Sequence, residues 1–189
     1  MLASSPLNAA LLIIDVQQGF DDPKWGKRNH PDAEANIAIL IDVWRRENGR
    51  VIHIQHCSTE SDSPLHPDGP GCQFKPEATP TAGEPVFKKT VNSAFIGTGL
   101  ESHLRGNGIE NIVIAGLTTD HCVSTTTRMA GNLGFNVTLV SDGTATFNRV
   151  GHDGIEYSAD EIHRIHLASL NGEFCAVRST TEILEDIGE

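Results

Sequence analysis

The cysteine at position 122 stands in the segment AGLTTDHCVSTTTRMA (residues 115–130), where an apolar run gives way to a helical pattern. Its thiol is a nucleophile, a metal ligand or a small core side chain. Free cysteines are among the most buried residue types, which favours the core. A helix that begins at Cys122 favours the nucleophile, because unpaired backbone N–H groups and a partial positive charge lower a thiol pKa and bind an oxyanion. The position alone leaves these alternatives open.

Two other reactive side chains also close apolar runs. Asp15 ends the run AALLIID, and Lys89 ends EPVFKK. Taken singly, the carboxylate is typical of a turn or helix cap, and the lysine is typical of a solvated strand end. Together with Cys122 they supply a proton acceptor, a charge stabiliser and a nucleophile. The three residue types predict covalent catalysis, provided that the fold brings them into one crevice.

Short apolar runs that alternate with helical patterns would position these residues. The predicted strands are residues 9–15, 50–55, 84–89, 111–116, 136–141 and 173–178, and helical spacing covers 32–48 and 100–108. Several runs lack polar alternation, which is typical of strands buried on both faces. This order predicts an α/β fold in a single domain (1–189), with a parallel sheet, right-handed crossovers and helices on both faces. Ligands bind such sheets beyond the carboxyl ends of the strands, where Asp15, Lys89 and Cys122 stand.

Composition limits the classes of partner and the compartment. The 189 residues suffice for one well-buried core, and the formal net charge of -11 opposes binding to nucleic acid or to anionic membranes. We therefore expect a small-molecule partner. The four cysteines have no paired spacing, and we identify neither a signal peptide nor an apolar run near the roughly 20 residues of a membrane span. These features predict a soluble cytoplasmic protein with free thiols.

The segment of residues 57–85, CSTESDSPLHPDGPGCQFKPEATPTAGEP, contains too many prolines and glycines for regular structure. Loops of this length in compact domains are usually functional or disordered. We expect an ordered loop that lies at the rim of the active site or in a subunit contact.

Three motifs, LLIIDVQQGF, KKTVNSAFIGT and IAGLTTDHCVSTTTRMA, occur in this order between residues 9 and 178. They resemble the isochorismatase-like cysteine hydrolases, a family that includes nicotinamidases, carbamoylsarcosine amidohydrolases and ureidoacrylate amidohydrolases. The resemblance implies a three-layer α/β/α fold with a six-stranded parallel sheet. It also implies a catalytic triad of Asp15, Lys89 and Cys122. Lys89 rather than Lys88 matches the family's lysine, which stands four residues before Ser-Ala-Phe.

The chemistry that the resemblance implies is hydrolysis of a C–N bond through a thioester. Asp15 would accept the thiol proton and Cys122 would attack an amide carbonyl. The backbone N–H groups of Thr118 and Cys122 would bind the oxyanion, on a loop with a cis Leu117–Thr118 peptide. The expected assembly is a homo-oligomer, a dimer or larger. A catalytically silent or scaffold protein of the same fold is the alternative.

Metal and cofactor are not expected. Nicotinamidases carry an Asp-x-His pair after the second strand, whereas this chain reads HIQHCSTESDSPLH. His53 is expected in the core, and His56, Cys57 and His66 remain as a candidate ligand set that lacks a carboxylate. A nicotinamidase-type, metal-assisted amidase therefore stays an alternative, and the metal-free thiol mechanism is the prediction.

Substrate contacts are predicted from side chains near the motif ends. The candidates are Gln17, Phe20, Trp25, Asn92 and Phe95. His163 and His166 are expected on the exposed side of a helix, and Asp120 and His121 are expected to orient the loop or cap the helix.

Overall fold

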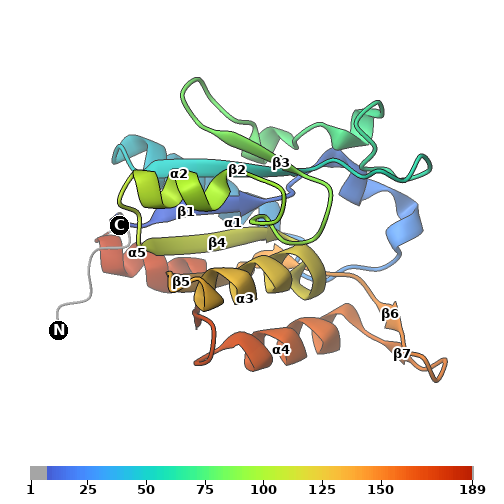
Figure 1. Ribbon diagram of the computed structural model, residues 1–189. Coiled ribbons are helices and arrows are strands. Elements are labelled where there is room, and N and C mark those ends of the chain that lie inside the picture. Colours follow the sequence, from blue (N-terminus) through green and yellow to red (C-terminus); the bar gives the residue numbers. More distant parts are fainter. Residues whose placement is uncertain (1–7, 189) are drawn as a thin grey trace.

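A parallel sheet lies between two layers of helices in the computed structural model, which describes residues 8–188 (Figure 1). The strands are β1 (Ala10–Ile14), β2 (Arg50–His56), β3 (Val86–Lys89), β4 (Asn111–Leu117), β5 (Asn136–Ala145) and β8 (Ala176–Arg178). They form a six-stranded sheet in the order β3-β2-β1-β4-β5-β8, with every neighbouring pair parallel. The predicted fold class and the six predicted strands are confirmed.

The helices cover both faces of the sheet. They are α1 (Ala33–Arg46), α2 (Leu100–Gly106), α3 (Ser124–Asn132), α4 (Ala159–Leu170) and α5 (Thr180–Ile187). A two-stranded antiparallel ribbon of β6 (Arg149–Val150) and β7 (Glu156–Tyr157) precedes α4. Among the described residues 8–188, no helix has the length and apolarity to cross a membrane.

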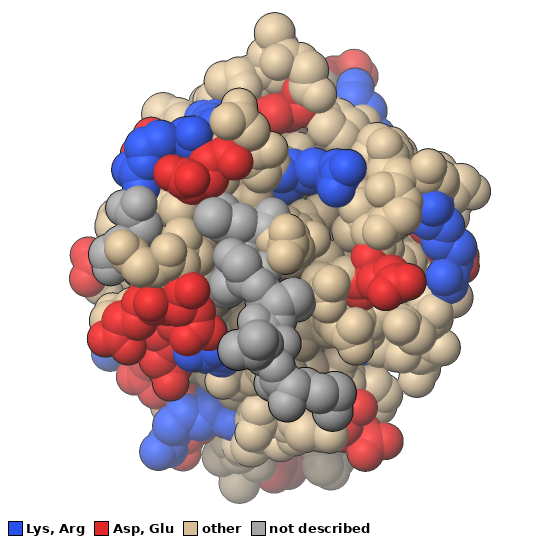
Figure 2. All heavy atoms as spheres, turned by 90° about the vertical axis from the view of Figure 1, so that its left-hand side faces the viewer, with Lys and Arg blue, Asp and Glu red and all other residues tan. Residues whose placement is uncertain are grey.

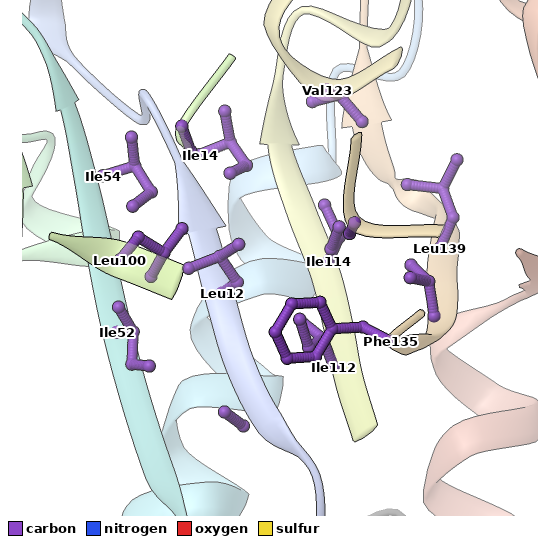
Figure 3. Close-up of a cluster of buried hydrophobic side chains, with 14 of the residues drawn as sticks. Leu12, Ile14, Ile52, Ile54, Leu100, Ile112, Ile114, Val123, Phe135 and Leu139 are labelled. Atoms are coloured by element: carbon purple, nitrogen blue, oxygen red, sulfur yellow. The ribbon is translucent and has the colours of Figure 1, made fainter. Parts of the chain in front are cut away.

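The core is divided by the sheet because successive side chains of a strand point to opposite faces. Leu12 and Ile14 of β1 pack with Leu100 of α2 and with strand residues of β2 and β4, as Figure 3 shows. Leu11 and Ile13 point the other way and pack with α1 and α5. All five residues of β1 are buried, so the predicted double-sided burial is confirmed for this strand. The end of β1 that leads to Asp15 is therefore held by packing on both faces of the sheet.

The order in which the chain adds strands to the sheet changes direction at β1. The strand β1 lies between β2 and β4, so the connections that follow β1 and β4 leave the sheet on opposite faces. A crevice forms at such a point beyond the carboxyl ends of the two strands. Asp15 directly follows β1, and the segment that contains Cys122 follows β4.

The segment of residues 57–85 is ordered by contacts with the end of β1. Short 3₁₀ turns form at Pro70–Cys72 and Pro76–Ala78, and the backbone N–H of Lys75 donates to the carbonyl of Val16 at 3.0 Å. The Lys75 ammonium is buried against the Glu34 carboxylate, with 2.7 Å between Nζ and Oε1. The segment therefore packs against the sheet end where Asp15 lies.

Gly116 allows β4 to approach β1 directly beside that end. Its φ is 132°, and a Cβ at this position would lie 2.0 Å from the carbonyl oxygen of Ile14. We expect Gly116→Ala to lower the free energy of unfolding by about 3 kcal/mol or more, because both backbone strain and a backbone clash result. Urea denaturation measures the loss. Gly106→Ala is the matched control, since a Cβ there meets nothing within 4 Å. Equal midpoints for the two variants would contradict this expectation.

Candidate active site

Three strand ends position the predicted triad. Asp15 follows β1, Lys89 is the last residue of β3, and Cys122 lies in a π-helical turn, Thr119–Val123, between β4 and α3. Asp15 has a φ of 50°, a left-handed conformation that Asp tolerates better than most residues. The side chain of Lys89 crosses the end of the intervening strand β2, because β3 is not a neighbour of β1. The structure thus brings together the three residues that the sequence singled out.

The Lys89 ammonium is the centre of this cluster. Its Nζ lies 2.5 Å from Asp15 Oδ2, 2.9 Å from His56 Nδ1 and 3.3 Å from Cys122 Sγ. The side chains of Lys89 and Asp15 are fully buried. An ammonium has three N–H donors and no acceptor, so these three atoms all act as acceptors. The buried cation is therefore completely coordinated by side chains.

His56 is a neutral member of the cluster that the sequence did not assign to catalysis. It ends β2, where it pairs in register with Lys89. Burial, followed by the Lys89 charge, lowers the pKa of His56 below its ordinary value. Because Nδ1 accepts from the ammonium, the ring proton stands on Nε2. His56 also lines the cavity in front of Cys122.

The Cys122 thiol is protonated at rest. Burial, and then the Asp15 charge, raises its pKa far above the ordinary value, and the nearby Lys89 charge offsets only part of the rise. The expectation of a pKa lowered by a helix N-terminus is wrong for the resting thiol. The helix α3 begins two residues later at Ser124, and desolvation of the buried sulfur outweighs a helix terminus. The nucleophile therefore needs a base, and the Asp15 carboxylate is in contact with the same ammonium.

The loop that carries Cys122 is held on two sides. The Leu117–Thr118 peptide is cis, which confirms that implication of the resemblance. Thr119 Oγ1 lies 2.9 Å from His163 Nδ1, and Arg149 Nε donates to Asp120 Oδ2 at 2.7 Å. Asp120 thus orients the loop, as expected. His163 is buried against the loop, so its predicted exposed position on the helix is wrong.

A cavity of about 270 Å³ opens in front of the thiol. Thr118 and Cys122 lie on its wall, together with three of the predicted substrate contacts, Phe20, Trp25 and Asn92. The Asn92 side-chain oxygen is 3.7 Å from Cys122 Sγ. A cavity of this volume accommodates a small molecule.

Two predicted substrate contacts lie elsewhere. The Gln17 side chain is fully buried and binds the backbone on both sides of the 57–72 segment, with Nε2 3.0 Å from His56 O and 2.9 Å from Cys72 O. Phe95 stacks on Phe135, with 5.9 Å between ring centroids, and packs against the core. Gln17 and Phe95 are therefore corrected from substrate contacts to structural residues. Proximity to a motif in sequence does not indicate the direction of a side chain.

Other parts of the wall come from segments that are distant in sequence, and from His121 beside the thiol, which was expected only to orient the loop or cap the helix. His121 and Arg149 line the cavity, and the segment 57–72 contributes a third side with Ser58, Thr59, Glu60, Ser63 and Leu65. Arg149 carries no motif that would have identified it. The prediction that residues 57–85 reach the rim of the site is confirmed for this part of the segment.

The opposite end of the sheet, where the strands begin, also has a hollow. A larger hollow of about 600 Å³ lies there, beside Ala9, Asn111 and Asn136 at the starts of three strands. Acidic and basic side chains lie next to one another at several places on that face (Figure 2). The hollow lies far from the reactive cluster, so the smaller cavity is the candidate active site.

Among residues 8–188, one group of potential metal ligands converges, and it differs from the candidate set named in the sequence analysis. Donor atoms of Asp15, His56 and Cys122 lie within 4.8 Å of one another. Lys89 Nζ contacts all three of these residues, so an ammonium occupies the place that an ion would take. His66 is not part of this group, and Cys57 faces Cys72. The candidate set of His56, Cys57 and His66 is therefore not assembled.

We expect activity to be independent of added or bound metal, because the Lys89 ammonium already neutralises this cluster. Elemental analysis of untagged protein should find well under one equivalent of zinc, iron or manganese, and EDTA dialysis should leave turnover unchanged. Lys89→Ala is the informative comparison, since it removes the cation and should increase zinc binding. A stoichiometric metal in the wild-type protein whose removal stops turnover would contradict the expectation.

Comparison with known proteins supports the resemblance. The Isochorismatase domain family model matches residues 9–182. The isochorismatase family protein YrdC of Bacillus subtilis is 48% identical over 94% of this chain and 95% of its own length. Nicotinamidase 3 of Arabidopsis thaliana is 28% identical, with 77% of each chain covered. A crystal structure of an isochorismatase-family hydrolase from Chromobacterium violaceum superposes with a TM-score of 0.95 at 49% identity, covering 99% of this chain and 97% of the other. The cluster and the cavity therefore lie in a chain that belongs to the isochorismatase family.

Proposed function

We propose that this protein is a cysteine amidohydrolase that cleaves the C–N bond of a small amide or carbamoyl compound. The observation that carries the proposal is the buried contact of one ammonium, Lys89, with both the Asp15 carboxylate and the Cys122 sulfur. A base and a nucleophile that share a cation at the wall of a cavity are the minimum set for acyl transfer. The name of one relative, a nicotinamidase, agrees with amide hydrolysis.

The first half-reaction forms a thioester. Substrate enters the cavity with its carbonyl carbon at Cys122 Sγ, and Asp15 accepts the thiol proton as the C–S bond forms. Proton transfer and attack occur together because the resting thiol has a raised pKa. The backbone N–H groups of Thr118 and Cys122 bind the oxyanion. The protonated Asp15 then donates to the nitrogen, which leaves as ammonia or an amine.

The second half-reaction hydrolyses the thioester. The Asp15 carboxylate, now free of its proton, removes a proton from a water molecule that attacks the acyl carbon. The C–S bond breaks, the acid product leaves, and the proton returns to the sulfur. Each step moves a proton between Asp15, sulfur, nitrogen and water, so no redox partner is required.

Lys89 and His56 keep this cluster ready for proton transfer. The ammonium lies 2.5 Å from the Asp15 carboxylate and stabilises negative charge on that carboxylate or on the sulfur, whichever holds it. The neutral His56 accepts from the ammonium and keeps Nε2–H available to an acceptor atom of the substrate. The buried Lys89 ammonium therefore compensates the negative charge both when it is on the Asp15 carboxylate and when it is on the Cys122 sulfur.

Ammonia release tests the proposal. Purified protein should release ammonia or amine from at least one member of a panel of small primary amides, ureas and carbamoyl compounds. Rapid quenching and intact mass measurement should then show an acyl adduct on Cys122. A folded protein that releases neither product from any compound and forms no adduct would favour the silent or scaffold alternative.

A further inference from the structure

A pair of thiols lies beside the active site and has no part in the proposed reaction. Cys57 and Cys72 have their Sγ atoms 4.0 Å apart, at the two ends of the segment 57–72 that forms one side of the cavity. We propose that this pair is an oxidisable site, at which a hydroperoxide forms a reversible disulfide that lowers the activity of the adjacent cavity. The bond itself is independent of the proposed function, whereas its effect on turnover rests on it.

The backbones of both cysteines are already held close together. The N–H of Cys57 donates to the carbonyl of Lys89 at 2.7 Å. The Gln17 amide donates to the carbonyls of His56 and Cys72 at 3.0 and 2.9 Å. One buried side chain therefore binds the backbone at both ends of the segment 57–72. A disulfide requires the sulfur atoms to approach to about 2.05 Å. With the backbones fixed, rotation of the side chains supplies most of this movement.

The two thiols differ in access, which sets the order of the steps. Cys57 is partly exposed, whereas Cys72 is buried. Burial, followed by the neighbouring Cys57, raises the pKa of Cys72 to about 11. Cys57 is thus the thiol that meets the oxidant first, and Cys72 is the resolving thiol.

The chemistry balances with one equivalent of hydroperoxide. Cys57 Sγ attacks one peroxide oxygen, the O–O bond breaks, and Cys57 sulfenic acid forms with release of water (or of an alcohol from an alkyl hydroperoxide). Cys72 Sγ then attacks the sulfenic sulfur, the S–O bond breaks, and hydroxide leaves with the Cys72 proton as water. The two thiols are oxidised to one disulfide and the peroxide is reduced. A dithiol reductant reverses the bond by exchange.

The bond would act on the site through His56 and through the wall of the cavity. Cys57 directly follows His56, whose ring contacts Lys89 Nζ at 2.9 Å. Cys72 Sγ also donates to the His56 carbonyl at 3.7 Å, and the disulfide removes this contact. Displacement of the His56 ring alters the coordination of the catalytic ammonium, and small misplacements of this kind lower turnover roughly tenfold or more.

The bond is tested first in Cys122→Ala protein, where the reactive thiol is absent and turnover plays no role. Hydrogen peroxide followed by quenching should lower the intact mass by about 2 Da, and peptide mapping should find Cys57 linked to Cys72. Dithiothreitol should restore the mass. Adding Cys57→Ser should abolish the linkage, whereas adding Cys175→Ser, which removes a buried thiol at the far hollow, should preserve it. Folded protein that gains only oxygen at Cys57, or no change at all, would overturn the proposal.

The effect on turnover is tested by comparing wild type with Cys57→Ser, each with its reactive Cys122. Both should have similar activity when reduced, because Cys57 does not line the cavity. After the same peroxide treatment, wild type should show an additional loss of roughly tenfold that dithiothreitol recovers and that Cys57→Ser lacks. Equal losses in both proteins would overturn the regulatory effect. Failure of the proposed function would instead appear as absence of turnover in both reduced proteins, with the mapped disulfide unaffected.

Discussion

Replacement of Cys122 by alanine should abolish turnover, with a loss of about 10⁴-fold or more in kcat/KM. The thiol is the only proposed nucleophile at the wall of the cavity, and loss of a nucleophile removes both half-reactions rather than weakening one contact. The fold should persist, because the change removes one sulfur atom beside an existing cavity. Steady-state ammonia release and thermal unfolding measured on the same preparation separate these two effects.

Cys175→Ala is the matched control for the Cys122 variant. Cys175 is also a buried free thiol, but it lies beside the hollow at the opposite end of the sheet. Turnover close to wild type is expected for this control. Retention of more than a few per cent of activity in Cys122→Ala would refute the thioester mechanism.

Replacement of Asp15 by asparagine should lower kcat/KM by about 10³-fold or more, because an amide of the same shape cannot accept the thiol proton or activate water. The same change should lower the pKa of Cys122. The negative charge of Asp15 disfavours the thiolate, and removing it leaves the Lys89 cation to favour that form. Ultraviolet titration of the thiolate should therefore shift to lower pH while ammonia release declines.

A thiol pKa that falls together with turnover distinguishes a lost base from a damaged fold, because the thiolate then forms more easily and the reaction still slows. Asp68→Asn provides the control for the change of charge, since its side chain is 93% exposed and does not line the cavity. It should leave both the thiol titration and turnover unaltered. An undiminished rate in Asp15→Asn would mean that another group is the base and that Asp15 is only a turn residue.

The pattern of apolar runs predicted the sheet because a strand that is buried on both faces consists of a short run of consecutive apolar residues. The run at residues 9–15 became β1, and the run at 111–116 became β4 within one residue. The prediction was less accurate where tertiary contacts set the boundary. The strand β5 extends to Ala145, four residues beyond the predicted end, because it follows β4 through a shift of register near Gly116. The helix expected at Cys122 instead begins at Ser124, after the π-helical turn.

The candidate site was partly predictable for a similar reason. Residues that directly follow buried parallel strands must lie at one edge of the sheet, so Asp15 and Lys89 could be assigned to the crevice before the strand order was known. His56 follows the same rule, as the last residue of β2, but a histidine in a long polar segment gave no sign of its contact with the ammonium. Arg149 and the wall formed by residues 57–72 reach the cavity from segments whose path depends on packing.

The sequence by itself therefore determined the fold class and the family resemblance and singled out three candidate residues, because apolar periodicity and motifs can be read directly along the chain. Only the tertiary structure decided that Lys89 reaches across β2 to contact Asp15, His56 and Cys122 at once. It also decided the direction of the thiol pKa, which burial raises although a helix terminus would lower it. Desolvation and the distances between charges depend on the positions of all surrounding atoms. These positions cannot be read from the spacing of residues along the chain.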